Sequence, residues 1–217
     1  MIQSVQETGR KFRLRSSDRL RVHFLALARR ITSWRRESMD LRSSDGVSIG
    51  ITSLEEKVGR SVVALNLAAA LASQGTTKVL LVETSFGSTS FGRKIPRPGH
   101  GLSDLVIGQQ PLDGCICGSN IENLFVLPAG QVSATSALDL PFDSLTSVNS
   151  ELNGSFDYVI YDLPVANETT LCFPIASQLD GILLVNLHSV QELAAQRVLK
   201  RFKQLGTEII GMVLNKV

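Results

Sequence analysis

Residues 47–73 read VSIGITSLEEKVGRSVVALNLAAALAS, and this stretch decides the fold. Residues 47–52 are a short apolar run of strand length, and residues 53–59 are polar and typical of a loop. Residues 60–73 are rich in Ala and Leu and contain no Pro or Gly before Gly75, which suits a helix that ends at a glycine. The stretch therefore predicts a strand, a loop and a helix in direct succession.

This succession is the layout of a phosphate cradle, in which backbone N–H groups and a helix N-terminus face the anion. The usual motif is G-x-x-x-x-G-K-[ST]. The matching run is residues 54–61, where Gly59 and Ser61 fit the pattern, Leu54 replaces the first glycine and Arg60 replaces the lysine. The loop is thus a damaged version of a phosphate-binding loop.

The departures from the motif have chemical consequences. Lysine is a compact point charge, whereas the guanidinium of Arg60 is planar and longer. Phosphoryl transfer depends on positioning, so we expect most of its rate to be lost. Glu55 and Glu56 add negative charge that only Lys57 offsets within the loop. From the motif alone, a nucleotide site and a coincidental strand–loop–helix both stay open.

The rest of the chain continues the alternation of strands and helices. Alternation of this kind predicts an α/β fold with a mostly parallel sheet and helices on both faces, a Rossmann-like three-layer arrangement of the P-loop NTPase type. Further strands are expected at residues 78–82, 124–127, 158–161, 181–186 and 208–214, and helices at residues 22–34, 102–107 and 190–205.

Charge divides the chain into two parts. Residues 1–45 hold eleven of the 22 Lys and Arg but five of the 20 Asp and Glu, although the formal net charge of the whole chain is +2. We therefore predict a basic N-terminal arm with one amphipathic helix over residues 1–45 and a P-loop NTPase-like domain over residues 46–217. Such an arm suits an anionic partner such as a membrane surface. A solvated tail is the equal alternative.

Composition narrows the setting of the protein. Three cysteines, Cys115, Cys117 and Cys172, form no zinc pattern and indicate a reducing compartment. No apolar stretch approaches the roughly 20 residues of a membrane helix, and the N-terminus has no secretory signal. We expect a cytoplasmic protein, peripheral to the inner membrane if the basic arm contacts lipid.

An ordered set of motifs over residues 47–217 resembles the bacterial tyrosine kinases of capsule and exopolysaccharide synthesis, a branch of the MinD/ParA P-loop superfamily. The set includes a Walker A-like strand, loop and helix, a second acidic strand and a Walker B-like strand that ends at an aspartate. The matching segments are ITS at 51–53, GRS at 59–61, KVLLVE at 78–83, GLSDL at 101–105, LPAG at 127–130, FDYVIYDLP at 156–164, DGILLV at 180–185 and GMVLNKV at 211–217.

The resemblance implies ATP and Mg²⁺ as cofactors and a membrane-embedded chain-length regulator or export protein as partner; nucleic acid is not expected. It assigns catalytic roles to Arg60, Asp162 and Glu83, and metal binding to Ser61 and Asp162. Nucleotide contacts are implied for Val58, Gly59, Arg60, Ser61, Val62 and, near the adenine, Asn215. A structural reading of Asp162 or Asn215 as a strand-end residue that holds a turn is the alternative.

Several positions depart from the family pattern. Glu83 and Ser85 stand where the family has two aspartates, and one methylene more in Glu83 would shift the geometry that Mg²⁺ requires. In the N-terminal helix, His23 and Ala26 replace the Glu and the first Arg used for ring assembly. The chain shows no C-terminal tyrosine cluster; its two tyrosines, Tyr158 and Tyr161, lie in a predicted strand.

These departures predict a degenerate family member, a pseudoenzyme that regulates exopolysaccharide or capsule synthesis or export with weak or absent ATP turnover. One alternative is an active ATPase or protein tyrosine kinase of the same pathway, which Ser61 and Asp162 favour. The other is a MinD/ParA-like positioning protein whose basic arm binds membrane or DNA. The branch-specific motifs at residues 127–130 and 156–164 argue against this last alternative.

Overall fold

Strand β1 (Val47–Ser53) occupies an interior position of a seven-stranded sheet with the order β3-β4-β2-β5-β1-β6-β7. The computed structural model describes residues 18–38, 45–86, 99–167, 170–187 and 192–215. Within them, β1 is flanked by β5 (Tyr158–Asp162) and β6 (Gly181–Asn186), and every residue of these three strands is buried. Val47, Ile49 and Ile51 of β1 belong to one apolar core, and the buried hydroxyls of Ser48 and Thr52 on the same strand are hydrogen-bonded.

The sheet is parallel except at one edge. On one side of β5 lie β2 (Val79–Glu83) and β4 (Leu124–Leu127), both parallel to it in the sheet, and β7 (Glu208–Leu214) pairs parallel to β6 at the other edge. The short β3 (Cys117–Gly118) pairs antiparallel to β4. The predicted α/β class with a mostly parallel sheet is therefore confirmed.

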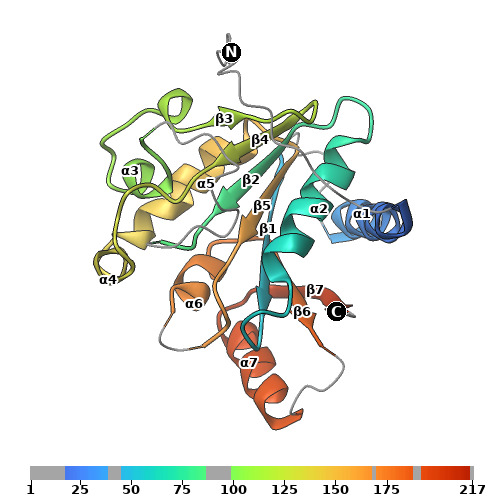
Figure 1. Cartoon of the computed structure of the whole chain (residues 1–217). Helices are drawn as coiled ribbons and strands as arrows, with labels where there is room; N and C mark the ends of the chain where they lie inside the picture. Colours follow the sequence, from blue (N-terminus) through green and yellow to red (C-terminus); the bar gives the residue numbers. More distant parts are fainter. Residues whose placement is uncertain (1–17, 39–44, 87–98, 168–169, 188–191, 216–217) are drawn as a thin grey trace.

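Helices cover both faces of this sheet, as Figure 1 shows. One face carries α1 (Asp18–Ser38) and α2 (Arg60–Ala72), which pack against each other and over one apolar core. The second core lies on the opposite face, and its helices are α3 (Leu102–Val106), α4 (Ala134–Ala137), α5 (Leu145–Asn153), α6 (Cys172–Ala176) and α7 (Glu192–Gln204), with 3₁₀ turns at Leu112–Gly114 and Phe142–Ser144.

Most expected elements are present, and their ends shift by a few residues. The strands expected at 124–127, 181–186 and 208–214 match β4, β6 and β7. Sequence reasoning missed β3, α4, α5 and α6, because these segments are short or lack a clear apolar period. The sequence also predicts a turn at residues 42–45 and a loop at residues 84–101, and both fall largely outside the described residues.

Helix α1 packs on the domain through its apolar stripe. Ala28 and Ile31 are almost fully buried in the core shared with α2, and Trp34 lies against the strand that begins at Gly181. The indole Nε1 of Trp34 donates a hydrogen bond to Glu208 at 2.8 Å. The apolar face of α1 thus packs against the rest of the fold. The division into an arm over residues 1–45 and a domain over residues 46–217 stays a prediction. Among the described residues, no helix is both long and apolar enough to cross a membrane.

The parallel arrangement gives the sheet two chemically different edges. Strands β1, β2, β5 and β6 end at the carboxyl edge, where Ser53, Glu83, Asp162 and Asn186 lie. Helix α2 begins at that edge and ends at the opposite, amino edge, where β5 and β6 begin. In open α/β sheets, ligands bind beyond the carboxyl ends of the strands. The candidate site is therefore sought there first.

Candidate functional site

The loop between β1 and α2 turns through two left-handed residues. Lys57 has φ 62° and Gly59, at the N-cap of α2, has φ 84°. A side chain at Gly59 would also collide with Asn215, because an added Cβ would lie 2.3 Å from the Asn215 amide nitrogen. Glycine is therefore required at this position by conformation and by space, as the motif predicts.

Asn215 holds this loop from the end of β7. Its side-chain nitrogen donates a 2.8 Å hydrogen bond to the carbonyl of Val58, whose side chain is buried. Sequence reasoning placed Asn215 beside a nucleotide base or in a structural turn, and the observed bond gives it a structural part. Asn186 acts similarly at the end of β6, because its side-chain Oδ1 accepts a hydrogen bond from the Leu54 N–H at 3.3 Å. Asn186 was not expected from the sequence.

Arg60 extends from the first residue of α2 back toward the strand ends. Its Nη1 donates to the Ser53 hydroxyl at 3.2 Å, and its Nε lies 3.5 Å from the Asp162 carboxylate. The Arg60 side chain is only 17% exposed and the Asp162 side chain is fully buried. A buried carboxylate requires a compensating charge, so this pair accounts for the direction that Arg60 takes.

Glu83 adds a second acid beside Asp162. The two residues are register partners on the neighbouring strands β2 and β5, and Glu83 is 4% exposed. The Thr84 hydroxyl donates to the backbone carbonyl of Asp162 at 2.6 Å and ties the ends of the two strands together. The structure thus brings all three predicted catalytic residues, Arg60, Asp162 and Glu83, to one place at the carboxyl edge.

The remaining predicted ligands lie on the first turn of α2. Ser61 is partly exposed and Val62 is 56% exposed, so both residues face away from the apolar core. The N-terminal turn of α2 therefore stays open toward solvent beside the loop. Helix N-termini of this kind attract anions through their backbone N–H groups.

A phosphate and a metal ion place different demands on these residues. The loop, the open first turn of α2 and the Ser61 hydroxyl fit a phosphate group. The carboxylate that would serve a magnesium ion does not fit as well, because the guanidinium of Arg60 lies beside Asp162. Two cations in contact with one carboxylate repel each other strongly in a buried setting. The donor set thus suits an anion at the first turn of α2, while the guanidinium of Arg60 competes with a divalent metal for Asp162.

Cys172 borders the same cluster from the start of α6. Its thiol donates to the Thr52 hydroxyl at 3.3 Å, and the Thr52 hydroxyl donates in turn to the Pro164 carbonyl. Burial raises the pKa of Cys172 to about 12, although the bond to Thr52 and the charge of Arg60 oppose that shift. The thiol is therefore protonated at neutral pH and does not act as a nucleophile.

Both tyrosines of the chain lie in β5 and are buried. Tyr158 is 4% exposed and Tyr161 is fully buried, with its hydroxyl donating to Asn149 at 3.1 Å. Burial raises the pKa of Tyr161 far above its usual value, with a further contribution from Asp180. Neither tyrosine is accessible to a phosphate donor while the sheet is folded.

Comparisons with known proteins find tyrosine-protein kinases and a succinoglycan biosynthesis transport protein. No family model matches the chain. The tyrosine-protein kinase CpsD of Streptococcus agalactiae is 26% identical over 185 residues, which are 84% of this chain and 80% of that protein. The succinoglycan biosynthesis transport protein ExoP of Rhizobium meliloti is 27% identical over 183 residues, which are 81% of this chain and 23% of that protein.

Solved structures of the same fold include kinase domains and MinD proteins. The VpsO kinase domain has a TM-score of 0.73 at 24% identity and covers 92% of this chain and 98% of its own length. The septum site-determining protein MinD of Pyrococcus horikoshii, complexed with Mg-ADP, has a TM-score of 0.65 at 24% identity and covers 78% of this chain and 70% of its own length. The resemblance to the tyrosine-kinase branch of the MinD/ParA superfamily is thus confirmed.

Proposed function

We propose that this chain is a degenerate tyrosine-kinase-like P-loop protein that regulates exopolysaccharide or capsule biosynthesis or export, with weak or absent ATP turnover. The pathway follows from similarity to proteins named for tyrosine phosphorylation and for succinoglycan transport. The loss of turnover rests on one observation, the contact of Arg60 with Asp162 and Ser53.

That contact supports a loss of turnover at a site that keeps the exposed first turn of α2. A cation at this loop position accelerates phosphoryl transfer only when it reaches the transferred phosphate. Arg60 instead lies against Asp162, so the cation is diverted and the carboxylate is screened from a metal. The open first turn of α2 is retained, which supports weak binding of a nucleotide or another phosphate compound.

The partner in this proposal is a membrane-embedded chain-length regulator or export protein. With both tyrosines buried in β5, the described residues offer no exposed tyrosine as a phosphate acceptor. A regulatory role through contact with such a partner therefore suits the chain better than a cycle of self-phosphorylation. Contact of the basic residues 1–45 with anionic lipid is a further part of the proposal.

The decisive experiment compares ATP binding and hydrolysis by the purified wild-type protein, Arg60→Lys and Arg60→Gln. We expect turnover at background for the wild type, and tighter nucleotide binding for Arg60→Lys because a compact ammonium reaches phosphate more easily. Arg197→Lys on α7, where Arg197 is exposed, is the matched control and should behave as the wild type. Clear wild-type turnover that disappears in Arg60→Gln would show an active enzyme instead.

The pathway is tested separately by deleting the gene and measuring exopolysaccharide. We expect reduced or misregulated polymer, and we expect Arg60→Gln to restore it as well as the wild type does, since catalysis is not required. Restoration by the wild type but not by a folded Arg60→Gln protein would contradict the regulatory role.

A further inference from the structure

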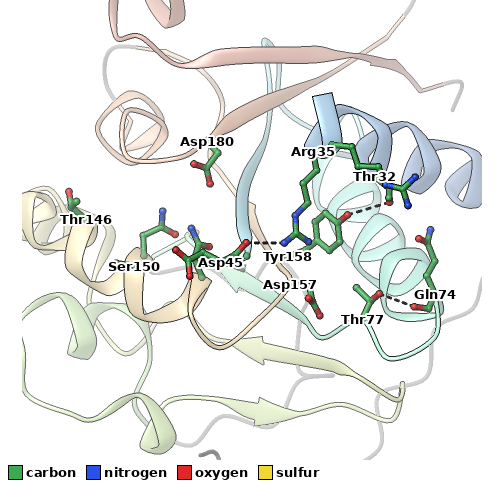
Figure 2. Close-up of a pocket in the computed structure, with 14 residues that line it drawn as sticks. Thr32, Arg35, Asp45, Gln74, Thr77, Thr146, Ser150, Asp157, Tyr158 and Asp180 are labelled. Atoms are coloured by element: carbon green, nitrogen blue, oxygen red, sulfur yellow. Dashed lines mark hydrogen bonds between the residues drawn. The ribbon is translucent and has the colours of Figure 1, made fainter. Parts of the chain in front are cut away.

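A polar pocket of about 700 Å³ opens at the amino edge of the sheet, on the opposite side of the strands from Arg60 and Asp162. Figure 2 shows α1 and α5 on its two sides, with the start of β5 between them. Its volume lies within the range of about 300–1,000 Å³ typical of small-molecule sites. The lining residues used below are Arg35, Arg36, Gln74, Ser150, Asn153 and Asp180.

Part of the lining is held rigidly by the fold. Arg35 donates to the Asp45 carbonyl at 2.9 Å, and its guanidinium lies 5.1 Å from the ring centre of Tyr158. Asp180 accepts two hydrogen bonds from Ser48, one from the backbone at 2.7 Å and one from the hydroxyl at 2.6 Å. The pocket is therefore preformed, which lowers the entropy lost when a ligand binds.

Other polar groups of the lining have no hydrogen-bond partner among the described residues. The side chains of Arg36, Gln74 and Ser150 bond to no other residue in the part of the chain that the structure describes. The Asn153 Oδ1 is buried there without a hydrogen-bond partner among those residues. Leaving such an acceptor unpaired costs about 1–3 kcal/mol, so a donor supplied by a ligand would be favoured.

The charges around the pocket exclude several ligand classes. Three carboxylates, of Asp45, Asp157 and Asp180, line it together with two guanidinium groups. Helices α2 and α5 also end there, and the negative ends of their dipoles add to the acidic side. A polyanion meets repulsion from these groups and a polycation meets the two arginines, while the polar walls offer little to an apolar ligand.

We infer that this pocket binds a neutral polyhydroxylated ligand, namely a carbohydrate. Each hydroxyl of a sugar donates one hydrogen bond and accepts others, so it can bond to a carboxylate on one side and to a guanidinium or amide on the other. A neutral molecule also avoids repulsion of either sign. The preference for a neutral polyol rests on the lining, whereas the choice of a glycan rests on the proposed function.

The pocket is separate from the candidate nucleotide site. Strand β5 begins at the pocket with Tyr158 and reaches the other edge at Asp162, so the sheet lies between the two sites. A glycan bound there would leave the loop around Gly59 uncovered. Binding to the pocket can therefore be measured without reference to ATP.

The experiment titrates the whole protein with maltotriose, cellotriose and laminaritriose by ligand-observed NMR and calorimetry. Myo-inositol, inorganic phosphate and spermidine serve as a neutral polyol that is not a glycan, an anion and a cation. Ser150→Tyr fills the pocket from the exposed side of α5, and Ser147→Tyr, on the same helix but outside the lining, is the matched control. Circular dichroism confirms that both variants fold.

We expect saturable binding of at least one oligosaccharide, weakened roughly tenfold or more by Ser150→Tyr and unchanged by Ser147→Tyr. Failure of every saccharide to bind, equal binding to Ser150→Tyr, or tighter binding of phosphate or spermidine would overturn the inference. Binding of myo-inositol alone would overturn the assignment to glycans. Clear ATP turnover that disappears in Arg60→Gln would refute the proposed function and leave the pocket result unaffected, so the two failures are distinguishable.

Discussion

The polar side chains at the carboxyl edge and at the amino edge of the sheet are arranged differently. At the carboxyl edge, Arg60 turns inward, with its Nε 3.5 Å from the Asp162 carboxylate and its Nη1 bonded to the Ser53 hydroxyl. At the amino edge, Arg36 and Ser150 remain exposed beside a pocket of about 700 Å³. The family resemblance directs attention to the first edge, whereas the side chains that remain available to a ligand lie mostly at the second.

Under the proposed function, the fold is retained while its phosphoryl-transfer chemistry is lost. Exchanging one lysine for Arg60 keeps the positive charge, but the longer side chain reaches the buried Asp162. In this proposal the guanidinium occupies the side of Asp162 that a metal ion would need. Three sets of variants, taken in order of expected effect, compare the carboxyl edge with the amino edge.

The largest effect is expected from Arg60→Ala. Removing the guanidinium leaves the buried Asp162 carboxylate without this counter-charge, and breaking a buried pair costs about 3 kcal/mol. Urea unfolding measures the loss of stability. Arg36→Ala at the amino edge is the matched control, with an expected change of less than about 0.5 kcal/mol because Arg36 is exposed. Equal effects of the two variants would remove the contrast between the edges.

An intermediate effect is expected from the buried bond between Tyr161 and Asn149. Asn149→Ala should cost about 2 kcal/mol, since its side chain also donates to Ser48 and to the Gln178 carbonyl, and Tyr161→Phe should cost about 1 kcal/mol. The double variant should lose less than the sum of the two, because both changes remove the same bond.

This double-mutant cycle tests the amino edge, because Asn149 lines the pocket there. Asn66→Ala on α2 is its control, since the bond from Asn66 to the Val62 carbonyl is exposed. Chemical denaturation of all four proteins gives the coupling. Strict additivity would show that the two buried side chains act independently.

The smallest effect is expected from Lys57→Gly in the loop of the carboxyl edge. Lys57 has φ 62°, a left-handed conformation that costs a residue with a side chain roughly 1 kcal/mol, so glycine should stabilise the fold by about that amount. Asn123 has the same φ of 62° but bonds to the Gly75 carbonyl, so Asn123→Gly should bring no gain. Thermal melting compares the two, and a loss of stability in Lys57→Gly would show that the loop uses the lysine side chain.

Much of the fold follows from patterns along the chain. Buried parallel strands need apolar runs, so β2 and β6 can be predicted from their composition. Helices α5 and α6 were missed because they are short and are stabilised by contacts such as those of Leu152 and Phe173 with the core, which no local period reveals. The three predicted catalytic residues meet because parallel strands end at one edge.

The amino-edge pocket was not predicted, and no motif marks it. Its lining comes from α1, the ends of α2 and α5, and the starts of β5 and β6, which are far apart in the sequence. Asn186 was not predicted, and Asn215 was predicted as a nucleotide contact or a turn residue. Their bonds to Leu54 and Val58 depend on how β6 and β7 end beside the loop.

By itself, the sequence determined the alternation of strands and helices, the glycine at position 59 and the substitution at Arg60, because these depend on local conformation and residue type. Only the tertiary structure decided where the Arg60 guanidinium points and which polar groups stay available. A long side chain has several possible partners within reach, and burial of Asp162 selects among them through the free-energy cost of an uncompensated charge.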